Sequence, residues 1–296
     1  SRSIAEVTPP WRGVSIKNTT IYHMMTRIQS IFCFLALALA VISFTGCGND
    51  DDGRGGFNLF TVEDDKMLGM ELRDEILANP AEYPVLEAAQ YPEAYNYLQG
   101  IVDDIINSGE VEYAQEFAWE VYIIDDPETL NAFAAPGGYI FVYSGLIQFL
   151  EEKDDFVGVM GHEIAHADLR HSTQQLTQQY GVATLLSLLL GEDRELLTNV
   201  LGSLLGLKFS RDDESQADEF SVIYLCETEY AANGAAGFFE KIVQAGTANP
   251  PEFLSTHPNP DNRVEDINTE AQERNCDTAY DSDDQGWRDF QNGLPN

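Results

Sequence analysis

Two histidines and a glutamate at a fixed spacing are the residues in this sequence best suited to chemistry. His162, Glu163 and His166 form the pattern His-Glu-x-x-His. Residues four apart lie one turn apart on the same face of an α-helix, so both imidazoles can reach one point. Two neutral imidazoles supply half of the tetrahedral site that Zn²⁺ prefers. Glu163 lies beside them, where it can accept a proton from a water molecule that the metal activates.

The surrounding segment predicts a long helix. Residues 154–178 contain no proline and begin with two aspartates that suit a helix N-terminus. Gly158 and Ala165 share the face of the histidines and would let another element approach closely. On an unbroken helix His171 lies about 180° from His162. The sequence therefore predicts His171 as a surface residue outside the site.

A catalytic zinc site also needs a third protein ligand and an open position. The acidic run after Ser210 predicts a helix on which Glu214 and Asp218 lie one turn apart. Glu214 suits the third ligand, and Asp218 suits a residue that holds a metal-bound imidazole by its other nitrogen. The alternative is a solvated acidic helix start, which the helix dipole favours.

The overall charge excludes several kinds of partner. The 296 residues include 16 Lys and Arg against 50 Asp and Glu, a net charge of -34. Nucleic acids and anionic lipid surfaces require basic patches, so neither is an expected partner. The sequence also has no glycine-rich phosphate loop, dinucleotide fingerprint or Gly-x-Ser-x-Gly motif. No feature specifies the oligomeric state.

The N-terminal part is typical of an exported protein. We interpret residues 1–46 as an upstream extension and a signal peptide, because Arg27 precedes a short apolar stretch over 31–44. The sequence Phe-Thr-Gly-Cys ending at Cys47 resembles a bacterial lipobox, so Cys47 is expected to carry lipid. Residues 47–60 then form a flexible tether. A plain cleaved signal and an uncleaved anchor are the alternatives.

This interpretation predicts the location and a redox environment. The protein would lie in the periplasm or cell envelope of a Gram-negative bacterium, anchored by lipid, with the outer membrane favoured over the inner. In an oxidising compartment Cys226 and Cys276 can form a disulfide, and two buried free thiols are the alternative.

The remaining patterns predict a mostly α fold with a small β-sheet. Apolar residues recur at helical spacing in three further segments, and two segments alternate as strands do. The predicted helices cover 61–79, 92–107 and 234–245, and the predicted strands cover 117–123 and 139–143.

Two apolar segments and the tail complete the chain. Residues 185–190 and 196–207 are too short to cross a bilayer, which takes about 20 residues. They predict packed core helices, with a membrane-touching or substrate-gating pair as the alternative. The tail over 276–296 is acidic and expected to be loosely held.

Four ordered motifs resemble those of one group of zinc endopeptidases. This group includes the CAAX prenyl proteases, the HtpX heat-shock proteases and the periplasmic BepA-like proteases. The resemblance covers about residues 60–275, which we take as a metallopeptidase domain over 61–275. The motifs are His162-Glu163-x-x-His166, Asn131 to Ile140, Glu214-x-x-Ala217-Asp218, and Thr256-His257-Pro258 with Arg263.

The resemblance implies a gluzincin-type fold with one Zn²⁺ per chain. The ion would be held by His162, His166 and Glu214, with Glu163 as the base. His257 and Arg263 would lie at the cleft, where they steady the oxyanion or control access. The chain lacks the multiple spanning helices of the membrane-embedded members, which favours the soluble periplasmic branch.

The sequence therefore predicts an endopeptidase that cleaves unfolded or misassembled cell-envelope proteins. An extended polypeptide substrate is expected to bind by adding a strand along Tyr139, Ile140 and Phe141, just before the metal helix. The alternative from another class is a non-catalytic, chaperone-like lipoprotein that binds outer-membrane proteins.

Overall fold

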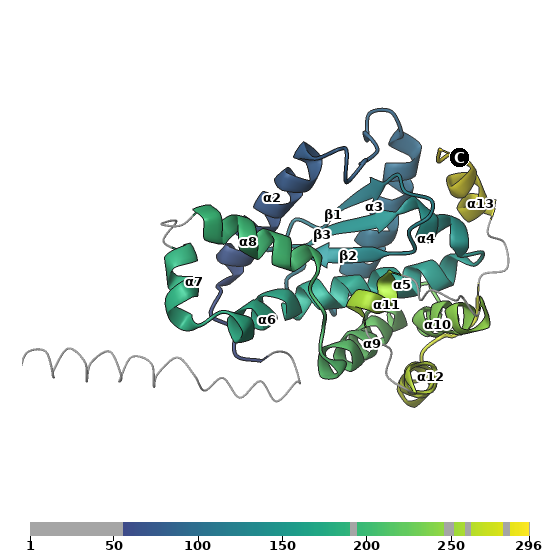
Figure 1. Ribbon diagram of the computed structural model, residues 1–296. Coiled ribbons are helices and arrows are strands. Elements are labelled where there is room, and N and C mark those ends of the chain that lie inside the picture. Colours follow the sequence, from purple (N-terminus) through teal and green to yellow (C-terminus); the bar gives the residue numbers. More distant parts are fainter. Residues whose placement is uncertain (1–55, 190–193, 246–251, 258–261, 281–284, 296) are drawn as a thin grey trace, which may run out of the picture. The chain divides into compact units, whose positions relative to one another are not determined.

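Helices surround one small three-stranded sheet (Figure 1). The computed structural model describes residues 56–189, 194–245, 252–257, 262–280 and 285–295. The mostly α fold with a small sheet is confirmed. The strands are β1 (Glu120–Ile124), β2 (Ala132–Ala135) and β3 (Tyr139–Tyr143). The helices are α2 (Val62–Ala78), α3 (Pro92–Ile106), α4 (Ser144–Phe149), α5 (Lys153–Asp168), α6 (His171–Gln179), α7 (Val182–Leu189), α8 (Arg194–Leu205), α9 (Arg211–Cys226), α10 (Gly234–Ala245), α11 (Phe253–Thr256), α12 (Arg263–Arg274) and α13 (Gln285–Asn292).

The strand order overturns one expectation about substrate binding. The sheet has the order β1-β3-β2, with β1 parallel and β2 antiparallel to β3. Tyr139, Ile140 and Phe141 are therefore in the central strand, and both of its edges are already paired. The prediction that a substrate strand adds along these residues is wrong, because their backbone groups bond to β1 and β2. The edge strand that packs against α5 is β2.

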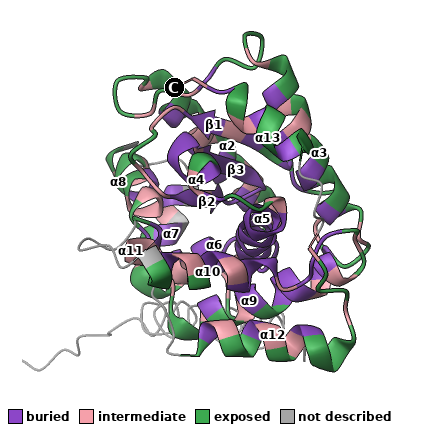
Figure 2. Cartoon of the chain, turned by 90° about the vertical axis from the view of Figure 1, so that its right-hand side faces the viewer, coloured by how far each residue is buried: buried purple, intermediate pink, exposed green. Residues whose placement is uncertain are grey.

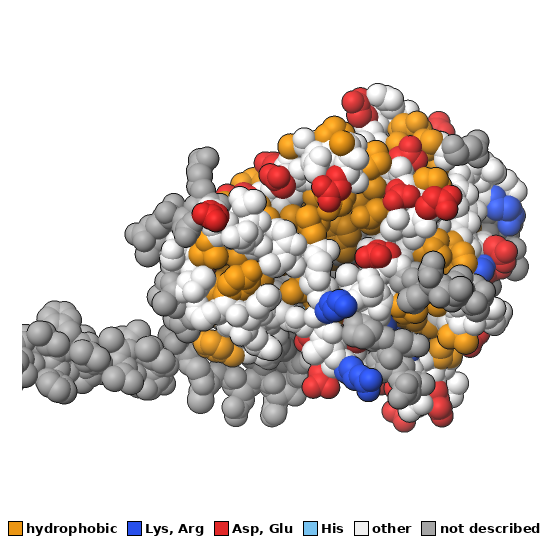
Figure 3. Space-filling view, in the orientation of Figure 1, with side chains coloured by type: hydrophobic (Ala, Val, Ile, Leu, Met, Phe, Trp, Pro, Cys, Tyr) orange, Lys and Arg blue, Asp and Glu red, His pale blue; other side chains and the backbone are white. Residues whose placement is uncertain are grey.

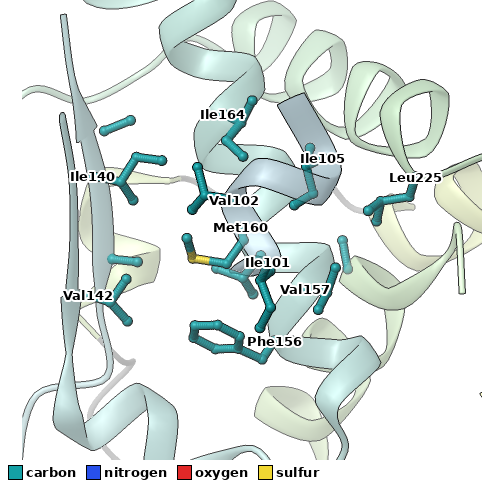
Figure 4. Packing of buried hydrophobic residues seen from close by; sticks show 14 of the residues in the cluster. Ile101, Val102, Ile105, Ile140, Val142, Phe156, Val157, Met160, Ile164 and Leu225 are labelled. Carbon is teal, nitrogen blue, oxygen red and sulfur yellow. The ribbon is translucent and has the colours of Figure 1, made fainter. Parts of the chain in front are cut away.

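The inner face of the sheet fixes the position of α5. Ile140 and Val142 point towards Met160 and Phe156 of α5, and side chains of α3 such as Ile101 complete the layer (Figure 4). All these side chains are buried. Burying each one stabilises the fold by about 1.5–3 kcal/mol, so α5 is held firmly against the strands.

Helix α5 is buried on all sides (Figure 2). Opposite the sheet it packs against α9 and α10. A Cβ atom on Gly158 would lie 1.9 Å from the backbone nitrogen of Ala235 in α10. The expectation that Gly158 lets another element approach closely is thus confirmed. Because α5 is buried all round and still carries charged and polar side chains, these side chains need partners inside the protein.

The predicted long helix is broken after the second histidine. α5 ends at Asp168, and Arg170 takes the left-handed conformation (φ 59°) before α6 begins at His171. Arg170 is held there by its ion pair with Asp65, at 2.5 Å, and by a hydrogen bond to the Phe60 carbonyl. The chain therefore changes direction, and the angle of about 180° expected between His162 and His171 on an unbroken helix does not apply.

The two leucine-rich segments form the short helices α7 and α8. Within the described ranges no helix combines the length and apolar character that a membrane span requires. Leu197 and Leu201 of α8 pack beside the outer end of the sheet, and Leu185 of α7 lies in a separate small cluster. Packed core helices are thus confirmed, and a gating role stays a prediction.

The C-terminal part is tied to the domain. Cys226 at the end of α9 and Cys276 after α12 form a disulfide. Trp287 of α13 is fully buried, and its indole N–H donates to the Leu150 carbonyl at 3.0 Å. The expectation of a loosely held tail is wrong for the described residues, because large aromatic side chains of α13 complete the main core.

Candidate metal centre

The two histidines of α5 meet as their spacing predicts. The Nε2 atoms of His162 and His166 lie 3.0 Å apart, and each residue is about 1% exposed. Because both come from one turn of a fixed helix, their separation is set by the helix itself.

Glu214 completes the predicted trio from the first turn of α9. The helix begins with a capping box between Ser210 and Asp213, which places Glu214 one residue further on. Its carboxylate oxygens lie 3.5 Å from Nε2 of His162 and 3.5 Å from Nε2 of His166. The other contact of Oε2 is an ion pair with Nη1 of Arg263 at 2.9 Å. Two imidazoles and a buried carboxylate are a donor set that fits a divalent metal.

His257 joins this group from the end of α11. Its Nδ1 lies 2.9 Å from Oε1 of Glu214 and 3.3 Å from Nε2 of His162. One ligand atom from each of the four residues lies within 4.8 Å of the others. Of the two roles expected for His257, this position favours control of access, because four protein ligands would leave no open corner.

Aromatic rings hold His257 and cover the centre. The His257 ring stacks on Phe253 at 4.3 Å, and Phe209 stacks on His166 at 3.9 Å. The backbone N–H of Phe209 donates to the Thr256 carbonyl at 3.2 Å, which joins the two covering segments. The centre is therefore closed to solvent. No motif in the sequence distinguished Phe209 from other aromatic residues.

Glu163 lies beside the donor atoms and contacts the sheet. Its Oε2 accepts a hydrogen bond from the backbone N–H of Ala134 in β2 at 3.0 Å. Its Oε1 is buried without a hydrogen bond, 3.6 Å from Nε2 of His257. Burial, and then the nearby charge of Glu214, raise the pKa of Glu163 to about 7. A carboxylate with a pKa near neutrality suits a general base.

Asp218 and Arg263 support the centre from behind. Oδ1 of Asp218 lies 2.9 Å from Nδ1 of His162, the position expected of a residue that orients this ring. Arg263 binds Asp218 through Nε and Nη2 at 2.5 and 2.7 Å, and its Nη1 lies 2.9 Å from Glu214. Arg263 is thus a positioning residue that neutralises two buried carboxylates. A direct role of Arg263 at an oxyanion stays a prediction.

His171 belongs to the centre, contrary to its expected place on the surface. It is fully buried, and its Nδ1 lies 2.9 Å from Nδ1 of His166. Its Nε2 lies 2.9 Å from Oε1 of Gln216. If Nε2 of His166 faces a metal, its Nδ1–H donates to His171, and His171 donates to Gln216. The break at Arg170 brings His171 here, and the periodicity of a continuous helix concealed it.

The electrostatics of the centre oppose protonation of two donors, Glu214 and His166. Burial also lowers the pKa of His162, but its hydrogen bonds to Asp218 and Glu214 outweigh burial and raise that pKa. Burial alone would raise the pKa of Glu214, but His257 and hydrogen bonds from the histidines lower it far below its usual value. Burial, with His162 adding to it, lowers the pKa of His166 well below the ordinary histidine value. Both groups are therefore held in the deprotonated form that metal ligation needs.

Replacing His171 tests its contact with His166. We expect His171→Phe, which keeps a ring of similar size, to weaken the affinity for a divalent metal by about 10- to 100-fold, because His166 loses the group that fixes its tautomer. Competition with a chromogenic chelator measures this affinity. His171→Asn, which retains an acceptor, should recover part of it. Wild-type affinity in His171→Phe, with an unchanged melting temperature, would contradict the assignment.

Comparison with known proteins identifies the family. The family model described as "Peptidase family M48" matches residues 92–271 of this chain. The mitochondrial metalloendopeptidase OMA1 of Schizosaccharomyces pombe is 28% identical over 250 residues, 81% of this chain and 71% of that protein. The metalloprotease YcaL of Escherichia coli is 24% identical over 249 residues, 79% of this chain and 94% of that protein.

A further similarity covers a smaller part of the relative. The beta-barrel assembly-enhancing protease of E. coli is 26% identical over 178 residues, 55% of this chain and 36% of that protein. Cys47, the predicted lipidation site, and the rest of the segment before residue 56 lie outside the described residues.

The matched range contains His162, Glu163, His166, Glu214 and His257, the residues that meet in the buried centre. The chain therefore belongs to peptidase family M48 and is a metalloendopeptidase.

Proposed function

We propose that this protein is a zinc-dependent endopeptidase that hydrolyses unfolded or misassembled proteins of the cell envelope. The observation that carries the proposal is the hydrogen bond from Ala134 to Glu163. It joins the edge of a β-strand directly to the group best suited to act as a base. A peptide bound along that edge would have its backbone beside the donor set.

Within the described residues the edge of β2 away from β3 pairs with no strand, so it suits an extended substrate better than the central strand does. Successive residues of a strand direct their N–H and C=O groups to opposite edges. Asn131 accepts from Tyr143 of β3, whereas Ala134 directs its N–H away from β3 to Glu163. Ala132, two residues earlier, directs its backbone groups to the same edge. Recognition by backbone groups reads extended conformation more than sequence, which favours unfolded substrates.

The donor set supports zinc as the metal. His162, His166 and Glu214 supply two nitrogens and one oxygen, a set found in catalytic zinc sites. When bound, the ion supplies a Lewis acid that polarises the scissile carbonyl and makes water more acidic. Glu163 would take the proton from the attacking water and deliver it to the departing amine.

The position of His257 implies a closed resting state. With His257 beside the other three donors, the centre has no free corner for water or substrate. We propose that the α11 segment withdraws together with Phe209 when substrate binds. Their shared backbone hydrogen bond lets the two segments move as a unit.

The same closed centre supports the alternative class of function. A non-catalytic, chaperone-like lipoprotein that binds outer-membrane proteins could keep four ligands on a permanently enclosed metal. Such a protein would need no carboxylate held beside the metal by the edge of a strand, however. The hydrogen bond from Ala134 that holds Glu163 beside the donor atoms therefore favours the endopeptidase.

A lipid anchor would determine at which membrane the protein encounters its substrates. We propose that Cys47 is lipidated and holds the domain at a membrane of the bacterial envelope, with the outer membrane favoured. Eight residues separate Cys47 from Gly56, and a chain of this length spans at most about 30 Å. Relatives named beta-barrel assembly-enhancing proteases support an envelope role.

Replacing the base separates the two classes of function. We expect Glu163→Gln to lower the turnover of reduced, unfolded casein about a thousandfold, because no other group takes the proton, while metal content is kept. Glu219→Gln, an exposed acid of α9, is the matched control and should be fully active. Equal action of Glu163→Gln and wild type in an aggregation assay, with no cleavage by either, would support the chaperone instead.

Removing the fourth donor tests the closed state. We expect His257→Ala to cleave casein about tenfold faster than wild type. Without the His257 ring the fourth position of the donor set stays open, so no fraction of the protein is held in the closed form. Ser255→Ala changes the same segment without touching the centre and should behave as wild type. A fall in rate with metal still bound would instead assign His257 a role in stabilising the oxyanion.

Replacing Cys47 tests the anchor. We expect Cys47→Ala to lose palmitate labelling in cells and to move from the membrane to the soluble fraction, because the lipid supplies the membrane affinity. Cys33→Ala, within the same leader, should leave both unchanged. Labelling that persists in Cys47→Ala would rule out this anchor.

A further inference from the structure

The outer face of the sheet, the face away from α5, carries a row of aromatic rings. Tyr122 of β1 is opposite Phe141 of β3, and Phe141 is opposite Phe133 of β2. The rings stack at 5.1 Å between Tyr122 and Phe141 and at 4.9 Å between Phe141 and Phe133. Figure 3 shows apolar side chains gathered over the strands on this face. The sheet thus displays one continuous row of stacked rings across all three strands.

The row ends on the strand edge beside the metal centre. Phe141 is fully buried between its neighbours, whereas Phe133, the last ring, is only half-buried. Phe133 directly precedes Ala134, whose N–H binds Glu163. The two faces of β2 therefore have different surroundings. Ala132 and Ala134 pack in the main core with α5, and Phe133 lies on the opposite face.

We propose that Phe133 forms a specificity subsite that selects an aromatic side chain of the substrate. This inference rests on the proposed binding of substrate along β2. A strand added to that edge lies about 4.8 Å away and alternates its side chains between the two faces of the sheet. A side chain opposite Phe133 on the outer face would extend the stacked row by one ring.

The cavity next to Phe133 has a mixed lining and extends to the centre. Its apolar side chains are those of Leu72, Phe133, Leu204 and Leu205, and its polar residues include Ser172 and His257. Leu204 and Leu205 also pack against the aromatic cluster on the outer face. In the closed state these leucines, the last two residues of α8, therefore fill the place that a substrate side chain would take once the end of α8 moves.

The chemistry of this place selects the class of side chain. A ring stacked on Phe133 would contact apolar atoms of the Phe133 ring. The polar contact of the row is at its other end, where the Tyr122 hydroxyl donates to Glu120 at 2.6 Å. A carboxylate placed here would lose its hydration and meet a protein of net charge -34. The subsite therefore takes an aromatic or large apolar residue and rejects an acidic one.

A peptide series tests the subsite. The host is a quenched fluorescent peptide of alternating Ala and Thr, into which one Phe is moved position by position, and mass spectrometry locates the cleaved bond. For wild type, kcat/KM should be about tenfold higher for a peptide with Phe than for the same peptide with Ala at one position relative to the cleaved bond. A second favoured position, if present, should lie two residues away, on the same face of the added strand. In Phe133→Ala this ratio should fall to near one. Phe133→Leu, which keeps bulk but not the ring, decides the question if the alanine variant is unstable.

The control variant lies in the same row. Tyr122→Ala removes the ring at the far end and should leave the Phe-to-Ala ratio unchanged. A ratio near one in wild type, or a tenfold ratio that survives in both Phe133 variants, would overturn the inference. If no variant cleaves any peptide, the proposed function fails, and binding of the same peptides to Glu163→Gln, measured by fluorescence anisotropy, still decides the subsite.

Discussion

The need to satisfy polar groups inside a fully buried helix organises this protein. An unpaired polar group in a core costs several kcal/mol, so each one on α5 requires a partner from another element. His162 has Asp218, His166 has His171, and Glu163 has the backbone of Ala134. These partners come from α9, the first residue of α6 and the edge strand β2, so the same contacts that assemble the fold also orient the donor atoms.

Side chains of the protein itself occupy the space that water and substrate would need in the proposed cleavage reaction. His257 lies beside the other three donors, and leucines at the end of α8 line the groove beside Phe133. These residues lie at the ends of α11 and α8, whereas His162 and Glu214 belong to α5 and α9, which pack against each other. An opening of these helix ends would therefore leave the donors of α5 and α9 in place.

Local spacing was sufficient to predict the donor set. His162 and His166 face one point because a helix repeats every 3.6 residues, and this holds wherever the helix is placed. The placement of Glu214 and Asp218 on one face of α9 followed from the same geometry. The mostly α fold, the helix bounds near 62, 92 and 234, and the pairing of Cys226 with Cys276 as one of two alternatives were also accessible. Each depends on residues close in sequence or on composition.

The sequence by itself thus determined which residues form the candidate donor set and which carboxylate lies beside it, whereas the tertiary structure alone decided what surrounds them. The left-handed turn at Arg170 brings His171 to the centre, and the order β1-β3-β2 makes β2 the edge strand in place of Tyr139 to Phe141. The position of His257 among the donors and the burial of Trp287 were likewise beyond the sequence. These features depend on contacts between residues far apart in the chain, and helix and strand periodicity carry information only about near neighbours.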